Sequence, residues 1–261
     1  MKNSMRTVSI VVPVYQADDW LPQCLKSIER QTYEAIELIV IDDPQGSGVA
    51  AARNRGLEKA TGEFIAFCDA DDYLEPDAIE RMVKAIDGVD MVAGSFRKFG
   101  DFQESVEHKT TEMTPPQIAA YVMGNLLRPR HNQMLSGCWA KLYRRSLVAP
   151  FPILKTAEDM AFNFEYLRRC KKVRFISDIV YNNRKHPGTL TTTFNESDKT
   201  ALFGFLEALG YVDRFLAPYI PEAQRAAALD SSKMYHSMLY FMRACQHTGL
   251  PMNDVFKRLY P

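Results

Sequence analysis

Acidic side chains gather at two points of the sequence where a short apolar run ends. Asp42 and Asp43 follow one run, and Asp69, Asp71 and Asp72 follow another. Carboxylates that share a site repel each other unless a positive group lies among them. An Asp-x-Asp pair on a turn can hold a hard divalent cation through its oxygens, with a phosphate completing the shell. These acids indicate a metal and phosphate site, although an isolated Asp-x-Asp also occurs in ordinary turns and helix caps.

A further pair of acids, Glu158 and Asp159, comes much later in the chain, at the start of an expected helix. A carboxylate there can accept a proton from a reacting hydroxyl group. It can equally cap the helix or stabilise its positive end. The residues alone leave both interpretations open.

The elements that would position these acids alternate between strand and helix. Nearly continuous apolar, β-branched runs predict strands that are buried on both faces. The expected strands are residues 8–14, 36–41, 63–68 and 89–93, and the expected helices are residues 18–31, 49–60 and 76–86. This alternation predicts an α/β fold with a mostly parallel central sheet and helices on both faces. Ligands of such sheets lie beyond the carboxyl ends of the strands, which is where the acids stand.

The alternation weakens in the second half. Residues 99–115 are polar and predict a loop or hairpin, followed by a helix at 116–127, strands at 138–143 and 173–181, and a helix at 157–169 between them. Helices at 198–216 and 226–245 then carry many aromatic and methionine side chains. Packing on the rest of the chain, dimerisation and docking on a membrane surface are three open explanations for that apolar surface.

Composition excludes several classes of protein. The chain has 261 residues, with 32 basic and 32 acidic side chains and a formal net charge of zero, so a basic surface for wrapping nucleic acid is not expected. Five cysteines without a CxxC pair predict neither a zinc site nor a disulfide framework, and a reducing cytoplasm is expected. Neither a signal peptide nor an apolar run of about 20 residues is found.

The zero net charge conceals an asymmetry between segments. Residues 1–127 hold 12 basic and 21 acidic side chains, a balance of −9, whereas residues 128–186 hold 13 and 4, a balance of +9. An acidic half that holds a cation and a basic segment that meets an anion would explain it, and so would solvated helix faces.

Several linked motifs resemble the family 2 glycosyltransferases of the GT-A fold. They run through residues 8–43 and 50–80. They resume at Trp139-Ala-Lys-Leu-Tyr-Arg-Arg, at Glu158-Asp159-Met-Ala-Phe and at Tyr181-Asn-Asn-Arg184-Lys-His186-Pro-Gly188. The resemblance implies a GT-A nucleotide-diphospho-sugar transferase fold, a nucleotide-diphosphate sugar donor, Mn²⁺ or Mg²⁺ as the cofactor, and inversion at the anomeric carbon.

The resemblance implies a role for each matched residue at the first two strand ends. Pro13, Val14 and Tyr15 would pack along the nucleotide base and ribose. Asp43, or its neighbour Asp42, would accept a hydrogen bond from the base, as the imide of a uracil requires.

The next motifs imply the metal and phosphate contacts. Arg53 would lie beside the base and the phosphates. Asp69 would lie near the ribose and Asp71 on the metal, with Ala70 between them in the same nucleotide-binding turn. Asp72 would cap the following helix.

The last motifs imply the catalytic base and a closing loop. Asp159 would remove the proton from the acceptor hydroxyl, on the side opposite the leaving diphosphate. Arg184 and His186 would lie over the diphosphate, with His186 as an additional metal or phosphate contact. The expected domains are a GT-A domain at 1–194, divided into a nucleotide-sugar half at 1–98 and an acceptor and base half at 99–194, and a helical extension at 195–261.

The predicted function is that of a metal-dependent, inverting hexosyltransferase that uses a UDP-sugar and a glycan or lipid-linked acceptor in cell-surface polysaccharide synthesis. It would be cytoplasmic, with peripheral contact at the inner face of the membrane, or a homodimer through the C-terminal helices, as alternatives. The chain departs from the family pattern at Gln16, where asparagine is usual, and at residues 44–48, which replace about one helix and one strand. That short segment supports the alternative of a non-catalytic relative that binds a nucleotide or carbohydrate.

Overall fold

The computed structural model describes residues 6–17, 19–101, 103–127, 137–186 and 199–249, with residues 251 and 254. Asp18, residues 128–136 of the expected acceptor region, Pro187 and Gly188 of the last motif, and the expected domain boundary at residue 194 lie outside the described residues.

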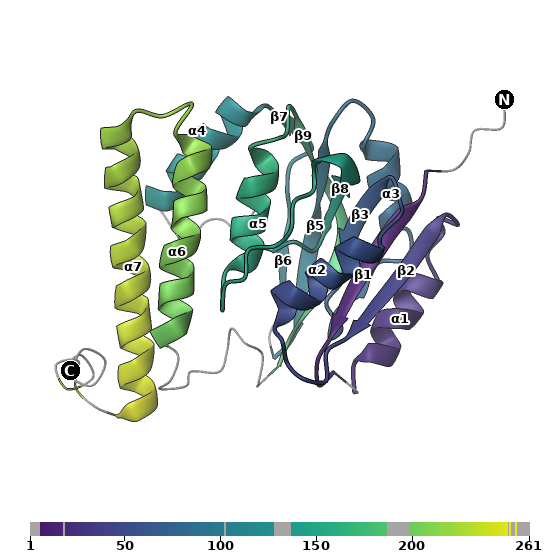
Figure 1. Cartoon of the computed structure of the whole chain (residues 1–261), viewed down its shortest axis with the longest axis horizontal. Helices are drawn as coiled ribbons and strands as arrows, with labels where there is room; N and C mark the ends of the chain where they lie inside the picture. Colours follow the sequence, from purple (N-terminus) through teal and green to yellow (C-terminus); the bar gives the residue numbers. More distant parts are fainter. Residues whose placement is uncertain are drawn as a thin grey trace.

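One mixed sheet forms the centre of the molecule (Figure 1). Its strands are β1 (Val8–Val14), β2 (Ile36–Asp42), β3 (Phe64–Phe67), β4 (Tyr73–Leu74), β5 (Met91–Gly100), β6 (Glu104–Val106), β7 (Thr111–Met113), β8 (Lys141–Arg144) and β9 (Val173–Lys185). The order is β2-β1-β3-β8-β5-β9-β4, with β6 on β5 and β7 on β9. On this path β2, β1, β3, β5 and β9 share one direction, and β8 and β4 oppose it. The prediction of a mostly parallel sheet is confirmed.

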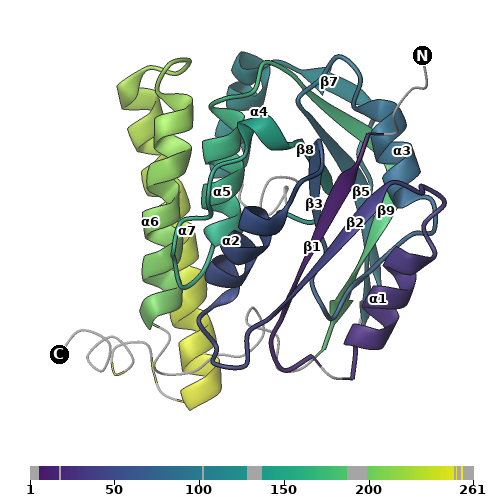
Figure 2. The same ribbon diagram turned by 45° about the vertical axis from the view of Figure 1, so that its right-hand side comes forward.

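Helices cover both faces of this sheet. They are α1 (Leu21–Glu29), α2 (Val49–Lys59), α3 (Ala78–Ala85), α4 (Pro115–Leu127), α5 (Glu158–Leu167), α6 (Lys199–Leu216) and α7 (Glu222–Thr248). Helices α1 and α3 pack on one face, whereas α2, α4 and α5 pack on the other. Figure 2 shows α6 and α7 as a further layer outside α4 and α5.

The first strand shows why the apolar runs predicted buried strands. Val8, Ile10 and Val12 point into the cluster with α1 and α3, whereas Val11 points into the cluster with α2 and α5. Successive side chains of a strand point to opposite faces, so a strand covered on both faces needs apolar residues throughout.

The edge strand β2 ends in the shortened segment. Residues 43–48 lead from β2 directly into α2, and Leu38 and Val40 on β2 are 38% and 39% exposed. Among the described strands, β2 pairs with β1 alone and forms an edge of the sheet.

The second half differs from the expectations mainly in strand length. Strand β5 continues to Gly100 and pairs with β6 in a hairpin, and β9 continues to Lys185. In α6, Leu209, Val212 and Phe215 belong to the cluster under α5, which supports the packing explanation for the C-terminal helices. No helix among those described combines the length and apolar composition needed to cross a bilayer.

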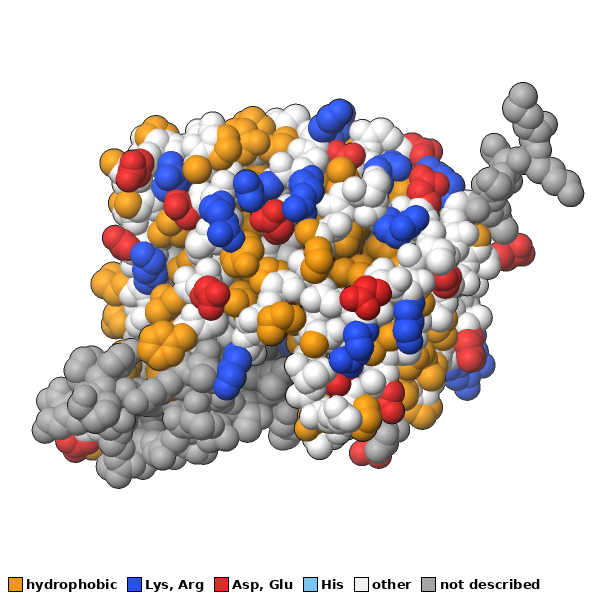
Figure 3. Space-filling view, in the orientation of Figure 1, with side chains coloured by type: hydrophobic (Ala, Val, Ile, Leu, Met, Phe, Trp, Pro, Cys, Tyr) orange, Lys and Arg blue, Asp and Glu red, His pale blue; other side chains and the backbone are white. Residues whose placement is uncertain are grey.

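The surface is chemically mixed. Basic, acidic and apolar side chains are interspersed over the face seen in Figure 3. On α7, Met234, Met238 and Met242 are exposed at helical spacing, so packing within this chain leaves part of the apolar surface of α7 in contact with solvent.

Candidate active site

The loop after β2 is organised around Asp43. Asp43 is 5% exposed, and its Oδ1 accepts hydrogen bonds from Ser47 Oγ at 2.6 Å and Arg55 Nη2 at 2.9 Å. Its Oδ2 accepts from the Gly48 N–H at 3.2 Å. The bond from Ser47, followed by those from Arg55 and Gly48, holds the pKa of Asp43 below its ordinary value. Asp42 is exposed, whereas Asp43 is buried and held by the loop, so the two candidate acids have different surroundings.

Of the three residues expected along the nucleotide base, Tyr15 alone is exposed. Pro13 and Val14 are buried in β1, so their side chains belong to the core. Tyr15 is 54% exposed, and a Cβ on Gly46 would lie 3.1 Å from its ring. Gly46, at φ +65°, therefore lets the loop lie against the aromatic ring.

Arg53 connects acids from separate parts of the chain. Its guanidinium donates from Nη2 to Asp69 Oδ1 at 2.8 Å, and from Nη1 to Asp159 Oδ1 at 2.5 Å and Glu158 Oε1 at 3.0 Å. It is 2% exposed and lies 5.3 Å from the ring centroid of Phe151. Both Nη atoms are engaged by these carboxylates, and the position of Arg53 beside the base and the phosphates stays a prediction.

The turn after β3 holds three acids in three different environments. Asp69 Oδ1 binds Arg53, Ala70 is buried, and Asp71 Oδ2 lies 3.2 Å from His186 Nε2. Burial, followed by the charge of Asp69, raises the pKa of Asp71, whereas His186 lowers it. The structure thus brings together the two residues predicted as metal contacts.

Asp72 is not the helix cap that the sequence predicted. It is fully buried and accepts from Tyr181 Oη at 2.7 Å and Asn183 Nδ2 at 2.9 Å. The Arg184 N–H donates to its other oxygen at 2.6 Å. Asp72 therefore ties the Asp-x-Asp turn to β9, whereas α3 begins at Ala78, several residues later.

The guanidinium of Arg184 is occupied by protein groups. It lies 4.0 Å from the ring centroid of Trp20 and 4.5 Å from that of Phe99. Its Nε donates to Asp71 O at 2.9 Å, and Nη2 binds Gln23 Oε1. Arg184 therefore has a structural role, because it joins β9, α1 and the turn that carries Asp71. Its contact with a diphosphate stays a prediction.

Glu158 and Asp159 begin α5 and are largely buried. Burial raises the pKa of Asp159, while Arg53 and hydrogen bonds from the thiol and N–H of Cys138 lower it. Burial and the charge of Asp159 raise the pKa of Glu158 to about 7. The N-cap position belongs to Ala157 at φ +58°, so neither acid is the helix cap.

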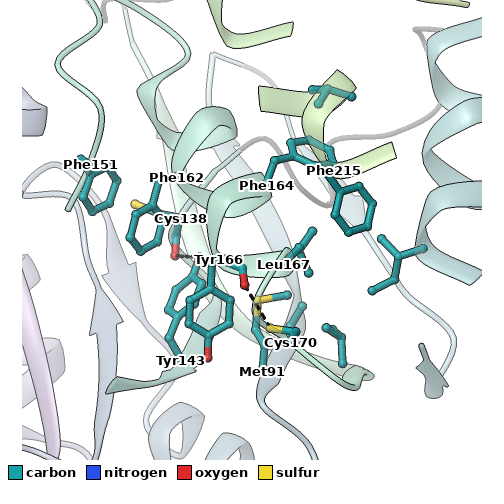
Figure 4. Close-up of a cluster of buried hydrophobic side chains, with 14 of the residues drawn as sticks. Met91, Cys138, Tyr143, Phe151, Phe162, Phe164, Tyr166, Leu167, Cys170 and Phe215 are labelled. Atoms are coloured by element: carbon teal, nitrogen blue, oxygen red, sulfur yellow. Dashed lines mark hydrogen bonds between the residues drawn. The ribbon is translucent and has the colours of Figure 1, made fainter. Parts of the chain in front are cut away.

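Sequence reasoning missed three participants in this site. Cys138 acts to lower the pKa of Asp159, Lys141 is a buried cation whose pKa Asp159 raises, and Arg55 holds Asp43. Lys141 left a signal, because it is a charged residue within the otherwise apolar run 138–143. The rings of Phe151 and Phe162 are stacked with their centroids 3.9 Å apart in the apolar cluster that Figure 4 shows, and Phe151 also lies against Arg53.

The donor set around Asp71 fits a divalent cation that a substrate helps to hold. No cluster of three or more histidine, cysteine or acidic side chains suited to a metal occurs in the described part of the chain. Mn²⁺ and Mg²⁺ at phosphate sites use one or two carboxylates, with phosphate oxygens and water completing the shell. Asp71 and His186 would supply the protein ligands.

Several known proteins are similar to this chain in sequence. The family model described as Glycosyl transferase family 2 matches residues 9–45 and 43–149. A Bacillus subtilis protein named Uncharacterized glycosyltransferase EpsJ is 28% identical over 224 residues, which cover 70% of this chain and 62% of that protein. Glycosyltransferase GlyA of Streptococcus pneumoniae is 26% identical over 253 residues, 81% of this chain and 36% of its own length. The chain therefore spans less than two thirds of these relatives.

Solved structures share the fold. TarS of S. aureus, crystallised with UDP-GlcNAc, superposes with a TM-score of 0.67 at 20% identity over 87% of this chain and 71% of that chain. The mannosyltransferase PcManGT of Pyrobaculum calidifontis, in complex with GDP-Man and Mn²⁺, gives a TM-score of 0.54 at 14% identity over 97% of this chain and 79% of that chain. The family model covers more than half of the sequence, and this chain belongs to glycosyl transferase family 2.

Proposed function

We propose that this chain transfers a sugar from a nucleotide-diphosphate donor, with a UDP-sugar as the first candidate, to a hydroxyl group of a glycan or lipid-linked acceptor, with inversion. The observation that carries the proposal is the link through Arg53 between Asp69, on the Asp-x-Asp turn, and Asp159, at the start of α5. It joins an acid expected on the donor side to an acid expected on the acceptor side.

The donor would bind at the carboxyl ends of β1, β2 and β3. Tyr15 offers an exposed aromatic surface for the base, and Asp43 retains a lone pair beyond its three hydrogen bonds. Asp71 and His186 would hold Mn²⁺ or Mg²⁺, which supplies positive charge to the leaving diphosphate. The imidazole of His186 makes Mn²⁺ the first ion to test.

Asp159 would act as the general base. Its Oδ1 is fixed by Arg53, and the thiol and N–H of Cys138 also act to lower its pKa. These donors stabilise the ionised form against the effect of burial, so Asp159 can accept the proton of the acceptor hydroxyl as the oxygen attacks the anomeric carbon. The proton ends on Asp159, and the electron pair of the broken bond leaves with the diphosphate.

The test is a donor screen with the purified chain, Mn²⁺ and a panel of nucleotide sugars, with released nucleoside diphosphate as the readout. Asp159→Asn is nearly isosteric and should lower transfer by roughly 100- to 10,000-fold, the usual contribution of general base catalysis, with unchanged nucleotide affinity. Glu165→Gln, on the same helix and paired with Arg168 and Arg169, is the matched control.

Two outcomes would contradict the proposal. A wild-type chain that binds a nucleotide sugar in calorimetry but releases no nucleoside diphosphate with any acceptor would support the alternative of a non-catalytic relative. An Asp159→Asn variant with full transfer activity would move the base to another residue, and Glu158 would be the first candidate.

A further inference from the structure

A buried carboxylate, that of Asp72, connects the Asp-x-Asp turn to the end of β9. Asp72 is 1% exposed, and the hydrogen bonds that its carboxylate accepts in the described structure all come from β9. Within the described ranges, no lysine, arginine or histidine lies within ion-pair distance of it. Aspartates are almost never fully buried unless they are paired, so a carboxylate at this position requires an explanation.

The arrangement of its donors explains why this residue is an acid. The Arg184 N–H donates to Oδ1 at 2.6 Å, whereas Tyr181 Oη and Asn183 Nδ2 donate to Oδ2 at 2.7 Å and 2.9 Å. An ionised carboxylate accepts on both oxygens, but an amide has one acceptor side and one donor side. Because a main-chain N–H can only donate, an amide at position 72 that accepts from Arg184 would turn its own NH₂ group toward Tyr181 and Asn183.

The hydroxyl group of Tyr181 extends this connection to the other side of the turn. While it donates to Asp72, its oxygen accepts from the Asp69 N–H at 3.0 Å. The Tyr181 ring is buried and stacks on Trp139, with the centroids 5.0 Å apart and the planes at 13°. One rigidly held hydroxyl group therefore bonds to residues before and after Asp71 in the sequence.

The end of β9 also brings His186 to Asp71. Arg184, whose N–H bonds to Asp72, donates from Nε to Asp71 O at 2.9 Å. Two residues further along the chain, His186 Nε2 lies 3.2 Å from Asp71 Oδ2. Neighbouring ligands of an octahedral ion with bonds of about 2.1 Å lie about 3.0 Å apart. The two predicted ligands thus already stand at a separation that suits a shared cation, and Asp72 bonds to both segments that carry them.

We propose that Tyr181 and Asp72 are positioning residues for the metal: their hydrogen bonds hold Asp71 and His186 at the separation that a shared Mn²⁺ or Mg²⁺ requires. Neither of the two positioning side chains would touch the ion. This inference rests on the metal site of the proposed function. Groups that hold metal ligands from behind typically contribute about 10- to 100-fold in metal affinity, because a site that is already ordered avoids the cost of ordering its ligands on binding.

The experiment compares two buried tyrosines with equivalent hydrogen bonds. Tyr166 Oη accepts from the Arg144 N–H at 2.8 Å and donates to Asp90 O at 2.7 Å. Asp90 precedes β5, at the opposite edge of the sheet from the Asp-x-Asp turn. Tyr181→Phe and Tyr166→Phe each remove one such hydroxyl group, and each should lower the Tm. The Kd for Mn²⁺ in the presence of UDP, measured by calorimetry, should rise about 10- to 100-fold in Tyr181→Phe alone.

A second variant, Asp72→Asn, tests the other half of the link. It is nearly isosteric but supplies an acceptor on one side only, so it should weaken Mn²⁺ binding to a similar extent. Because both residues act through one network, the double variant should lose no more affinity than the more affected single variant. Excess Mn²⁺ should restore sugar transfer to Tyr181→Phe. It should not restore transfer to Asp159→Asn, in which the base itself is lost.

The outcomes separate this inference from the proposed function. An unchanged Mn²⁺ affinity in Tyr181→Phe or in Asp72→Asn would overturn the inference. So would an equal loss of affinity in Tyr166→Phe, because it would mean a general structural effect, and so would a wild-type chain that binds no Mn²⁺ with UDP. A wild-type chain that binds Mn²⁺ and UDP but transfers no sugar would instead contradict the proposed function, and the Mn²⁺ affinities of the variants would still decide this inference.

Discussion

Two groups of charged residues meet at Arg53, and their surroundings differ. The donor group (Asp43, Arg55, Asp69, Asp71 and His186) is paired, with Asp69 bound to Arg53, and all of its members except Asp43 are partly open to solvent. The base group (Cys138, Glu158 and Asp159) is largely buried at the start of α5. A wetter site lets a charged nucleotide enter and leave, whereas a drier site shifts pKa values toward those needed for proton transfer.

The pKa directions express the same contrast. Hydrogen bonds, with that from Ser47 first, lower the pKa of Asp43, so its ionised form is stabilised in the fold. Burial raises the pKa values of Glu158 and Asp159, so their ionised forms are held at a cost in stability. Ionised Asp43 therefore strengthens the fold, whereas ionised Glu158 and Asp159, like ionised Asp71 beside Asp69, weaken it.

The largest effect should come from removing the residue that the two groups share. Arg53→Gln leaves three carboxylates with reduced compensation, two of them largely buried. Breaking one partner of a buried ion pair typically costs about 3–5 kcal/mol. Urea unfolding should show a loss of that order. The matched variant Arg55→Gln removes a half-exposed arginine from Asp43 and should cost less than about 1 kcal/mol. Equal losses would mean that the two groups are not different environments.

A smaller effect, confined to the base group, should depend on pH. The pKa of Glu158 is raised from 4.5 to about 7. Because an acid with a raised folded-state pKa stabilises the fold when protonated, its contribution is complete below about pH 4.5 and is lost as the pH rises through 7. Glu158→Gln stays neutral and should gain stability relative to the wild type between pH 5 and 8, by up to about 3 kcal/mol.

Urea unfolding of both proteins at several pH values in that window measures the gain. Glu165→Gln, at a partly exposed position on the same helix, should show no comparable trend. A difference between Glu158→Gln and the wild type that is the same at pH 5 and pH 8 would mean that Glu158 does not titrate in this range.

The donor group should respond in binding more than in stability. Asp71→Asn removes one of the two predicted protein ligands of the metal, so calorimetry should show the Mn²⁺-dependent affinity for UDP falling at least about tenfold, or ~1.4 kcal/mol. The fold should change little, because burial and the neighbouring Asp69 already disfavour the ionised carboxylate. Asp87→Asn, at an exposed aspartate, serves as the control. Unaltered binding by Asp71→Asn would assign the metal to other residues.

The sequence predicted the strands of the first half well for a physical reason. Strand β1 was expected at its observed ends, because a strand buried on both faces requires an apolar run that stops where the sheet stops. Strand β2 was expected within one residue of its observed ends, but the prediction that both of its faces are buried was wrong, because Leu38 and Val40 lie on an exposed face of this edge strand. The ends of β5 and β9 were missed because Lys98 and Asn183 are polar yet lie in these strands. Lys98 pairs with Glu104 on β6, and Asn183 donates a hydrogen bond to Asp72, which is far away in the sequence. Neither partner could be identified from the strand's own sequence.

The sequence allowed us to predict which residues belong to the site, but not which residues they contact. The motifs drew attention to Arg53, Asp71, Asp159, Arg184 and His186, and the structure brings Asp71 to His186. That Arg53 would bind acids from two parts of the chain, or that Arg184 would lie between Trp20 and Phe99, depends on packing between distant segments. Periodicity and spacing report local structure, so such contacts are beyond them.

The smallest expected effects concern one strained residue beside each group. Gln16 follows Tyr15 with φ +48°, and Ala157 precedes Glu158 with φ +58°. Left-handed backbone costs an ordinary L-residue about 1–2 kcal/mol, and asparagine and glycine adopt it more easily. Gln16→Asn and Ala157→Gly should each raise the free energy of unfolding by roughly 0.5–1 kcal/mol. The left-handed φ at position 16 also explains in physical terms why the family favours asparagine there.

Their functional consequences should differ, which sharpens the comparison between the groups. Asparagine keeps the turn at position 16, so UDP affinity should remain unchanged in Gln16→Asn. Glycine at position 157 releases a restraint on the backbone that sets the direction of Glu158 and Asp159, so transfer should fall severalfold although the protein is more stable, as expected where strain serves function. Steady-state kinetics beside thermal unfolding tests this pair. If Ala157→Gly gains stability and keeps full activity, the left-handed residue is a tolerated defect, and packing by Arg53 and Cys138 alone orients the base.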